Sequence, residues 1–443
     1  MELGGRKIVV VGLGKTGIQT VRFLLKKGAE IRASEINHLE KLSEDVKVFM
    51  ESGVRIESGG HHEETFLWAD TIVLSPGVPF NIPPVKKALD KGIEVISELE
   101  LASRFIKKPI VGITGSNGKT TTSTLVSRIL GASGMRVFLG GNIGTPLVQI
   151  AGEDEGFDYL VLELSSFQLQ GVSTFRPHIG ILLNISPNHL DHHESFEEYV
   201  NSKLKLFSSQ GLDDWAIYNL DDPVVGTCPL HKLNSRKIPF GKTPAEDRVF
   251  FDGDCVRFMG EIYDIKGMKL PGIHNVENAM AAIASTRVLG CKPGLIEREI
   301  LEFLPLPHRI EFVREIKEAR FYNDSKSTSP GATLKALECF SCQVILIAGG
   351  KDKGVSYGIL REEIKRKVKL LILFGESRSR MKRELGEEVN TVLASSLEEA
   401  VGLAVKDMGK GDTVLFSPGC SSFDMFSSYE ERGGRFKQIV QDI

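Results

Sequence analysis

Cysteines, aromatic residues and long hydrophobic runs are all scarce in this sequence. Only six cysteines occur in 443 residues, and only Cys339 and Cys342 stand close together. A zinc site would need a second pair of ligands nearby, so the pattern favours two buried thiols at a helix end, with no metal and no disulfide. The longest apolar runs, VILIAG and LLILFG, have the length of strands, far short of a bilayer span. We expect no membrane insertion.

An excess of charge of one sign is also missing. The formal net charge is −3 at pH 7, which offers no basic surface to nucleic acid or to an acidic membrane. The first residues, MELGGRKIVVVGLGKTG, run straight into a glycine loop and do not resemble a signal peptide. The sequence therefore predicts a cytoplasmic protein that does not bind nucleic acid.

The chain does contain an alternation of short apolar strands and helical segments, which indicates an α/β fold with parallel sheets. It is too long for one core, and about 150 residues per domain suggests three domains. We place a Rossmann-like domain at residues 1–99, a central domain with a mostly parallel sheet at 100–305 and a second Rossmann-like domain at 306–443. The proline-rich segment at 304–308 is expected to act as a hinge before the third domain.

The segment PIVGITGSNGKTTTSTLV, residues 109–126, is similar to a phosphate-binding P-loop. Gly118, Lys119 and Thr120 close the motif G-x-x-x-x-G-K-[ST], although Ile113 stands where its first glycine belongs. Backbone N–H groups at the start of the next helix would face an anion, Lys119 would reach the outer phosphates, and Thr120 would ligate Mg²⁺. The central domain is therefore predicted to be a P-loop-type ATPase; the alternative is an ordinary glycine turn.

A second glycine loop follows the first apolar strand. Gly12, Gly14 and Gly17 have the spacing G-x-G-x-x-G, and Glu35 ends the next strand. This fits a dinucleotide fingerprint with an acid about 20 residues further on. Because the helix end senses only the diphosphate, a mononucleotide diphosphate would fit as well as NAD or FAD. The loop predicts a bound nucleotide rather than a packing turn alone.

Other candidate ligands stand near the ends of later strands. Glu163 ends the apolar strand of YLVLELSS, where a carboxylate could serve Mg²⁺ or cap a neighbouring helix. The run LNISPNHLDHHES is predicted to be mostly a solvated loop, with His189 as the exception because it follows a strand end closely. Lys203 falls on an amphipathic helix, where the ordinary interpretation is a surface lysine.

Cations also gather in the third domain. The pair His308-Arg309, the run Lys326–Thr328 and the turn AGGKDKG could line a cleft. An arginine beside an ATP-binding cleft suits bidentate contact with phosphate.

Together these motifs resemble the Mur ligases, the ATP-dependent amide ligases of peptidoglycan synthesis. The segments TGSNGKTT, GGNIG, LELSSFQL, LNISPNHLDHH, GIHNVENAMAA, LPHRIEFV and NDSKST follow in the family's order over essentially the whole chain. Within the family, VVGLGKTG with SPGV, the compact length and SPGCSSFDMFSSYEERG favour the branch that adds D-glutamate.

The resemblance implies a two-step reaction. ATP would phosphorylate the terminal carboxylate of UDP-N-acetylmuramoyl-L-alanine, and the amine of D-glutamate would attack the acyl phosphate with loss of phosphate. It also implies two Mg²⁺ sites, a monomer, and a third domain that binds the amino acid and closes over ATP.

The resemblance further assigns roles to residues. The family's catalytic positions match Lys119, Glu163, His189 and Lys203. Its ATP-binding positions match Gly115, Ser116, Asn117, Gly118, Lys119, Thr120, Thr121, Asn278, Arg309 and Asp324. Its UDP-substrate positions match Gly14, Lys15, Thr16, Glu35, Ser75, Gly77, Asn142 and His189. Its D-glutamate positions match Lys326, Thr328, Lys353, Ser422 and Phe423. Its metal positions match Thr120, Glu163, His189 and Lys203, the last of these expected as a carbamate.

The sequence departs from the family's common pattern at three places. Glu35-Ile36-Asn37 stands where an Asp and a nearby Arg are frequent, Phe423 replaces Leu, and Tyr429 replaces Phe. These departures bear on the uracil contacts and on the shape of the acceptor pocket.

Four alternatives stay open at this point. A sister Mur ligase would add L-alanine or a diamino acid, although Lys326 and Lys353 favour a dicarboxylate acceptor. A folate polyglutamate ligase would lack the first glycine-loop domain. An NAD-dependent oxidoreductase would leave Lys119 and Glu163 without a role, and a non-catalytic nucleotide-binding scaffold would need no acceptor.

Overall fold

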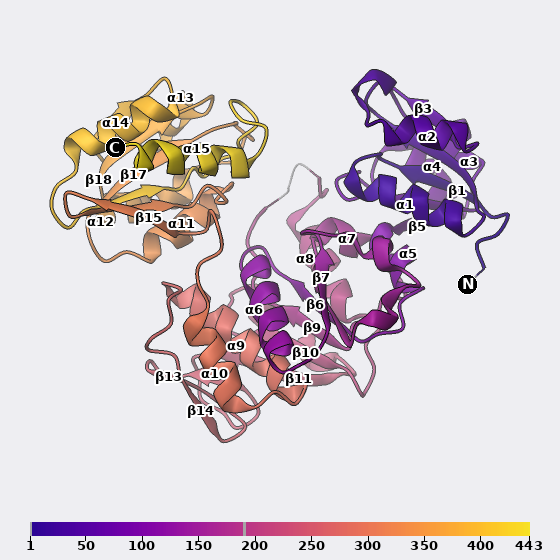
Figure 1. Cartoon of the computed structure of the whole chain (residues 1–443), viewed down its shortest axis with the longest axis horizontal. Coiled ribbons are helices and arrows are strands. Elements are labelled where there is room, and N and C mark those ends of the chain that lie inside the picture. Colours follow the sequence, from indigo (N-terminus) through magenta and orange to yellow (C-terminus); the bar gives the residue numbers. More distant parts are fainter. Residues whose placement is uncertain (1, 189–191) are drawn as a thin grey trace. The chain divides into compact units, whose positions relative to one another are not determined.

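The computed structural model describes residues 2–188 and 192–443, and three β-sheets form among them (Figure 1). Residue contacts divide the chain into two compact units, Met1–Gly267 with Glu277–Leu301 and Met268–Val276 with Glu302–Ile443. The α/β class and the mostly parallel sheets confirm the predicted fold class. The domain boundaries near residues 99 and 305 stay predictions.

The first sheet is parallel throughout, with the strand order β3-β2-β1-β4-β5. Its central strand has the sequence KIVVV and is buried from its second residue on, as expected for a strand covered on both faces. The strands are β1 (Lys7–Val11), β2 (Glu30–Glu35), β3 (Arg55–Ser58), β4 (Thr71–Leu74) and β5 (Glu94–Ser97). The helices are α1 (Lys15–Lys26), α2 (Asp45–Glu51), α3 (Glu63–Leu67), α4 (Pro83–Asp90) and α5 (Glu98–Ser103).

The second sheet has nine strands in the order β14-β13-β12-β11-β10-β9-β6-β8-β7. It is parallel from β7 to β12, and β13 and β14 add an antiparallel edge. The strands are β6 (Ile110–Thr114), β7 (Val137–Gly141), β8 (Tyr159–Glu163), β9 (Ile179–Leu182), β10 (Trp215–Asn219), β11 (Arg236–Gly241), β12 (Val249–Phe251), β13 (Cys255–Phe258) and β14 (Glu261–Asp264). The α-helices are α6 (Lys119–Ala132), α7 (Ser166–Gln170), α8 (Phe196–Leu204), α9 (Ile273–Val288) and α10 (Pro293–Glu302), and a short 3₁₀ helix, η2, covers Leu147–Ile150.

The third sheet lies in the second unit and has the order β15-β16-β20-β17-β18-β19. Only β15 is antiparallel to its neighbour. The strand VILIAG is buried at all six positions and forms the centre of this core. The strands are β15 (Glu311–Ile316), β16 (Ala319–Asn323), β17 (Val344–Gly349), β18 (Val368–Phe374), β19 (Thr391–Leu393) and β20 (Thr413–Phe416). The helices are α11 (Pro330–Glu338), α12 (Arg361–Lys367), α13 (Arg378–Leu385), α14 (Leu397–Asp407) and α15 (Tyr429–Gln441).

Both tryptophans of the chain belong to the first unit. Trp68 is the C-cap that follows α3, and the guanidinium of Arg32 lies 4.0 Å from its ring centroid. Trp215 begins β10, with the guanidinium of Arg236 at 5.1 Å. Among the described residues, no helix combines the length and the hydrophobicity that crossing a bilayer requires.

Candidate functional site

The turn between β6 and α6 is shaped by glycine. Gly118 is the N-cap of α6 and has φ +84°, a left-handed conformation that favours glycine. A Cβ at this position would also overlap the side-chain oxygen of Asn278. Helix α6 therefore starts directly at the turn, where its first N–H groups lack partners within the helix and can hold phosphate oxygens.

The first residues of α6 meet a carboxylate from the neighbouring strand β8. The Lys119 Nζ donates hydrogen bonds to the carbonyl oxygens of Gly115 at 2.9 Å and Ser116 at 3.0 Å. The Thr120 hydroxyl donates to Glu163 Oε2 at 2.7 Å, and Glu163 is buried. Because β6 and β8 are paired in parallel, their carboxyl ends are adjacent. The structure thus brings the ammonium, hydroxyl and carboxylate together.

Side chains outside the loop hold its remaining residues. The Ser116 hydroxyl lies 2.8 Å from the Tyr199 hydroxyl, and the Asn117 N–H donates to the side chain of Asn184 at 2.8 Å. Burial raises the pKa of Tyr199 to about 12, so this phenol stays neutral. The motif analysis missed Tyr199 and Asn184, because neither belongs to the glycine loop.

Two further residues predicted to bind ATP lie beside the loop. Thr121 is buried in the first turn of α6. Asn278, on α9, accepts a hydrogen bond from the Thr122 hydroxyl at 3.2 Å. Both therefore lie next to the turn that the glycines form.

Lys203 is not a surface lysine, so that ordinary interpretation is wrong. It comes from α8, is only 2% exposed, and its Nζ donates to the carbonyl of Gly115 at 2.9 Å. Burial, reinforced by the Lys119 ammonium, holds the pKa of Lys203 well below its usual range, although the Glu163 carboxylate acts in the opposite direction. His189, its predicted companion, lies outside the described residues.

The prediction of a solvated loop is wrong for His193. Its side chain is buried, stacks on Phe167 with 5.5 Å between ring centroids, and lies 3.0 Å through Nε2 from the Ser166 hydroxyl. Phe167, on the preceding helix α7, provides the apolar contact that a charge-rich segment did not suggest.

The first glycine loop, between β1 and α1, is shaped by its backbone. A Cβ on Gly17 would overlap the carbonyl oxygen of Gly12, so α1 can pack this tightly only with glycine there. The Ser75 hydroxyl donates to the same carbonyl at 2.8 Å. Gly14 is the exposed N-cap of α1, and Thr16 lies in its first turn. The predicted diphosphate cradle is thus an open helix start. Gly77 follows Ser75 by two residues and has φ +94°, a left-handed conformation that favours glycine.

Glu35 ends β2 and supports the glycine loop. Its Oε2 accepts from the N–H of Leu13 at 2.7 Å, and its Oε1 accepts from the N–H of Asn37 at 2.9 Å. These bonds, together with that from the Asn37 side chain, outweigh burial and lower the pKa of Glu35. Both carboxylate oxygens are therefore engaged by the chain itself.

The β7–η2 turn joins the two glycine-loop regions. Asn142 donates from Nδ2 to Glu163 Oε1 at 2.8 Å, which links it to the P-loop cluster. Lys15, in the first turn of α1, donates to the carbonyl of Gly144 at 2.6 Å. The buried Glu98 accepts from the N–H of Val148 at 2.7 Å. Burial raises the pKa of Glu98 to about 7, with the Val148 bond opposing the shift.

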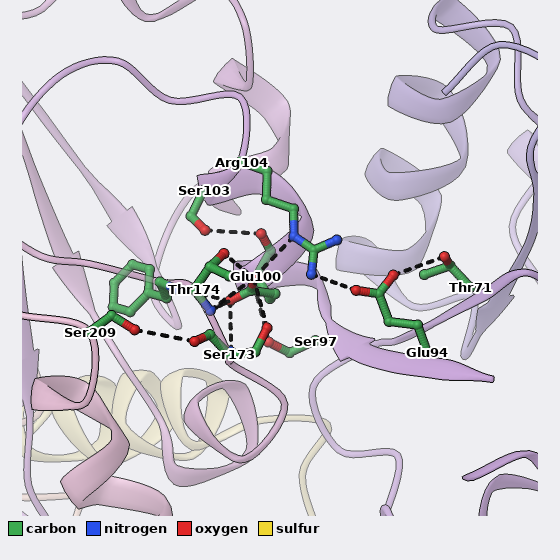
Figure 2. Close-up of polar contacts among 10 residues, drawn as sticks. Thr71, Glu94, Ser97, Glu100, Ser103, Arg104, Ser173, Thr174 and Ser209 are labelled. Carbon is green, nitrogen blue, oxygen red and sulfur yellow. Dashed lines mark hydrogen bonds and ion pairs between the residues drawn. The ribbon is translucent and has the colours of Figure 1, made fainter. Parts of the chain in front are cut away.

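A second acid of α5 ties the first sheet's region to the second (Figure 2). Glu100 accepts hydrogen bonds from the consecutive N–H groups of Ser173, Thr174 and Phe175. Arg104 bridges Glu100 at 3.0 Å and Glu94 at 2.7 Å. Burial raises the pKa of Glu100, but the bonds from Thr174 and Ser173 outweigh it and the net shift is downward. Glu98 and Glu100 carry no motif, and the alternation ELEL is their only sequence signal.

In the second unit, buried Asp324 follows β16 and organises a turn. It accepts hydrogen bonds from the hydroxyls of Ser327 and Ser417, and from the N–H of Ile310 at 3.2 Å. Burial raises the pKa of Asp324 to about 6, opposed by these hydrogen bonds. Arg309, which precedes Ile310, interacts with Asp324 electrostatically. The structure therefore places these two predicted ATP-binding residues together.

The residues predicted to bind D-glutamate surround the ends of the third sheet. Lys326 Nζ lies 3.6 Å from the ring centroid of Tyr429, and Thr328 follows in the same turn. Ser422 is buried after β20, whereas Phe423 is 71% exposed and Lys353 is exposed in the turn after β17.

Arg432 of α15 holds two of these turns and was also missed. Its buried guanidinium donates to the carbonyl oxygens of Ser325 and Ser421. The signal was available in the segment SYEERGG, where Arg432 lies in the first turn of the amphipathic helix α15.

Cys339 and Cys342 are free thiols and half-buried, less buried than expected. Burial raises the pKa of Cys339 to about 12, which keeps it protonated.

Comparison with protein families finds three matches in succession. The Mur ligase MurD-like N-terminal domain matches residues 6–97, the Mur ligase middle domain matches 113–286, and the Mur ligase glutamate ligase domain matches 308–420.

Several relatives match over the whole chain. A UDP-N-acetylmuramoylalanine–D-glutamate ligase of Citrifermentans bemidjiense is 44% identical, with 100% of this chain and 98% of the relative covered. The protein of that name from Geotalea daltonii is also 44% identical, covering 100% and 99%. That from Bdellovibrio bacteriovorus is 42% identical, covering 99% and 98%.

Solved structures share the fold at lower identity. The MurF ligase of Thermotoga maritima, in complex with ADP, is 18% identical with a TM-score of 0.62, covering 100% of this chain and 96% of the other. A pseudomurein peptide ligase type C of Methanothermus fervidus is 21% identical with a TM-score of 0.63, covering 99% and 100%.

Proposed function

The chain belongs to the Mur ligase family, and from this premise we propose that it catalyses the ATP-dependent addition of D-glutamate to UDP-N-acetylmuramoyl-L-alanine in peptidoglycan precursor synthesis. The identity of 44% over the full length to ligases named for this reaction carries the proposal. The sister-ligase alternative is not favoured, because the relatives from Citrifermentans bemidjiense, Geotalea daltonii and Bdellovibrio bacteriovorus are all named for the addition of D-glutamate.

The proposed chemistry has two steps. A carboxylate oxygen of the L-alanyl group attacks the γ-phosphorus of ATP, the bond from that phosphorus to the β–γ bridging oxygen breaks, and ADP leaves. The amine of D-glutamate then attacks the acyl carbon and loses a proton, and inorganic phosphate leaves. Phosphorylation is needed because a carboxylate is a poor electrophile.

The residues of the P-loop cluster suit the first step. Lys119 and the N–H groups at the start of α6 would hold the phosphates of ATP, with Gly115 to Thr121 forming the cradle. Asn278, beside the loop, is proposed to contact the nucleotide. Asn142 and Lys15 meet at the β7–η2 turn and would position the UDP-linked substrate, whose diphosphate would lie at Gly14, Thr16, Ser75 and Gly77.

A magnesium site fits the residues present. No group of three His, Cys, Asp or Glu that could hold a metal occurs in the part of the chain that the structure describes. Mg²⁺ commonly takes one or two carboxylates and completes its shell with water and substrate phosphates. Thr120 and buried Glu163 supply adjacent oxygen ligands for such a site. When bound, the ion would offset phosphate charge.

We propose a second metal site that uses His189 and a carbamate on Lys203. A carbamate would replace a buried ammonium by a carboxylate-like ligand, and the location of Lys203 against Gly115 supports this role. Enzyme equilibrated with ¹³C-labelled CO₂ should show a carbamate carbon resonance that disappears in Lys203→Ala. The same spectrum for both proteins would contradict the modification.

The second unit is proposed to bind the acceptor and to close over ATP. Lys326 and Lys353 supply cations for the two carboxylates of D-glutamate, with Thr328, Ser422 and Phe423 as further contacts. Arg309 and Asp324 would contact ATP. We also propose a cytoplasmic monomer with domains at 1–99, 100–305 and 306–443; light scattering after gel filtration would test the monomer.

The deciding experiment measures phosphate release from ATP with UDP-N-acetylmuramoyl-L-alanine, offering D-glutamate, L-glutamate, L-alanine and meso-diaminopimelate in parallel. Release with D-glutamate alone is expected. Release with another acceptor would assign the chain to a sister branch, and no release with any acceptor would remove the proposed activity.

A further inference from the structure

The turn that follows β3 is joined to the turn that follows β2. The N–H of Gly59 donates to the carbonyl of Asn37 at 3.1 Å, and the N–H of Gly60 donates to the carbonyl of Glu35 at 3.3 Å. The strands themselves are parallel neighbours, with Glu35 opposite Ser58. The two turns therefore form one wall at the carboxyl edge of the first sheet.

His61 projects from this wall in a fixed orientation. Its Nδ1 lies 2.8 Å from the hydroxyl of buried Ser34, and its ring makes an edge contact with Phe66 at 6.0 Å between centroids. The other ring nitrogen, Nε2, makes no hydrogen bond or ion pair with any residue in 2–188 or 192–443. One nitrogen thus anchors the ring while the other is available to a ligand.

The imidazole is suited to a neutral partner. Burial lowers the pKa of His61, although Glu57 and Glu35 act against this shift and His62 adds to it. A neutral imidazole accepts or donates a hydrogen bond without attracting phosphate charge.

The strand order predicts that a nucleoside bound at the first glycine loop would lie on the side of β2 and β3, where His61 lies. With the diphosphate at the start of α1, a nucleotide bound at the end of β1 in a sheet of order β3-β2-β1-β4-β5 extends its sugar over the end of β2. The base then lies towards β3. Glu35, which would bind the ribose in a dinucleotide fold, already uses both oxygens on Leu13 and Asn37. A nucleoside bound there would therefore need other contacts from the wall at β2 and β3.

We propose that His61 is a specificity-determining residue that hydrogen-bonds the uridine nucleoside of the UDP-linked substrate through Nε2. This inference rests on the proposed function, because it presupposes UDP at the first glycine loop. It assigns His61 to the nucleoside and not to the diphosphate.

Direct titration of the full-length protein with UDP and with inorganic pyrophosphate tests the assignment. His61→Ala should weaken UDP binding about tenfold, the size expected from losing one good hydrogen bond, and leave pyrophosphate binding within twofold. The matched control is His62→Ala, because the neighbouring His62 pairs with Glu57 at 3.3 Å instead. That variant should bind both ligands as the native protein does.

Kinetics with the complete substrates provides a second readout. His61→Ala should raise KM for UDP-N-acetylmuramoyl-L-alanine by the same factor while KM for ATP and kcat stay within twofold, and His61→Gln should recover part of the loss. Unchanged UDP affinity in His61→Ala, or an equal loss for pyrophosphate, would overturn the assignment. UDP binding that depends on His61 in a protein without ligase turnover would remove the proposed function and leave the assignment intact.

Discussion

The two glycine loops of the first unit start helices in the same manner and differ in what surrounds them. The loop before α1 is shaped mainly by backbone: Gly17 packs on Gly12, and Glu35 accepts from the N–H of Leu13. The loop before α6 is surrounded by side chains that reach it from other elements. Among them, Glu163 meets Thr120, and Tyr199 meets Ser116.

This difference separates holding a phosphate from reacting with it. Backbone N–H groups at a helix start are enough to bind a diphosphate. A transferred phosphoryl group also needs charges fixed where they develop in the transition state. We therefore propose the loop before α1 as a binding site and the loop before α6 as a catalytic one.

The largest effect is expected from removing the Lys119 charge in the loop before α6, which tests whether the two loops have separate roles. Lys119→Met should lower kcat about 10³-fold, roughly 4 kcal/mol of transition-state stabilisation. Affinity for UDP at the other loop should stay within threefold. Phosphate release and UDP titration measure the two effects, and a parallel loss of UDP binding would contradict the separation.

Glu98 of α5 accepts a hydrogen bond from Val148 of η2, and its titration should change the free energy of unfolding. A carboxyl with a folded pKa of about 7 binds more protons folded than unfolded between pH 4.5 and 7, so unfolding free energy falls as pH rises through this window. The difference amounts to about 3 kcal/mol above pH 7. Glu98→Gln keeps an acceptor for Val148 and should not show this fall.

Denaturant unfolding of both proteins at pH 5 and pH 8 measures this effect. Relative to the native protein, Glu98→Gln should become more stable as the pH rises. Equal pH dependence in the two proteins would show that Glu98 does not titrate in this range.

At the binding loop, the expected effect is smaller and falls on KM. Lys15→Ala removes a charged hydrogen bond to Gly144, worth about 2 kcal/mol, and should raise KM for the UDP-linked substrate roughly 30-fold with little change in kcat. Lys26→Ala is the control, because this exposed lysine of the same helix pairs at the surface with Glu153, at 3.4 Å, and with no other residue that the structure describes. A fall in kcat alone would contradict the binding role of Lys15.

The smallest effect is expected from Tyr199, whose hydroxyl holds Ser116 in the loop before α6. Tyr199→Phe deletes one hydrogen bond to Ser116, worth about 1 kcal/mol, and should lower kcat/KM for ATP about fivefold. The variant's melting temperature provides the control. An unchanged kcat/KM with a lowered melting temperature would make Tyr199 purely structural.

The glycine loops could be predicted from sequence because a local backbone requirement appears as a local pattern. Gly118 must be glycine for its own φ, and the next residues follow it directly into α6. The alternation of strands and helices likewise predicted the fold class, because each buried strand appears as a short apolar run in its own segment.

The surrounding support could not be predicted in the same way. Tyr199 reaches Ser116 from 83 positions away, and Glu100 reaches Thr174 from 74. Such pairs depend on how strands are ordered in the sheet, which a single segment does not encode. The same reason explains His193, whose burial depends on the ring of Phe167.

The placement of the tryptophans confines tryptophan fluorescence to one of the two units. Trp68 and Trp215 both lie in the first unit, so tryptophan emission reports on that unit alone. Circular dichroism records helices in both units. A single denaturant titration followed by both signals therefore compares two melting transitions without a label, and a gap between their midpoints reads directly as independent unfolding of the second unit.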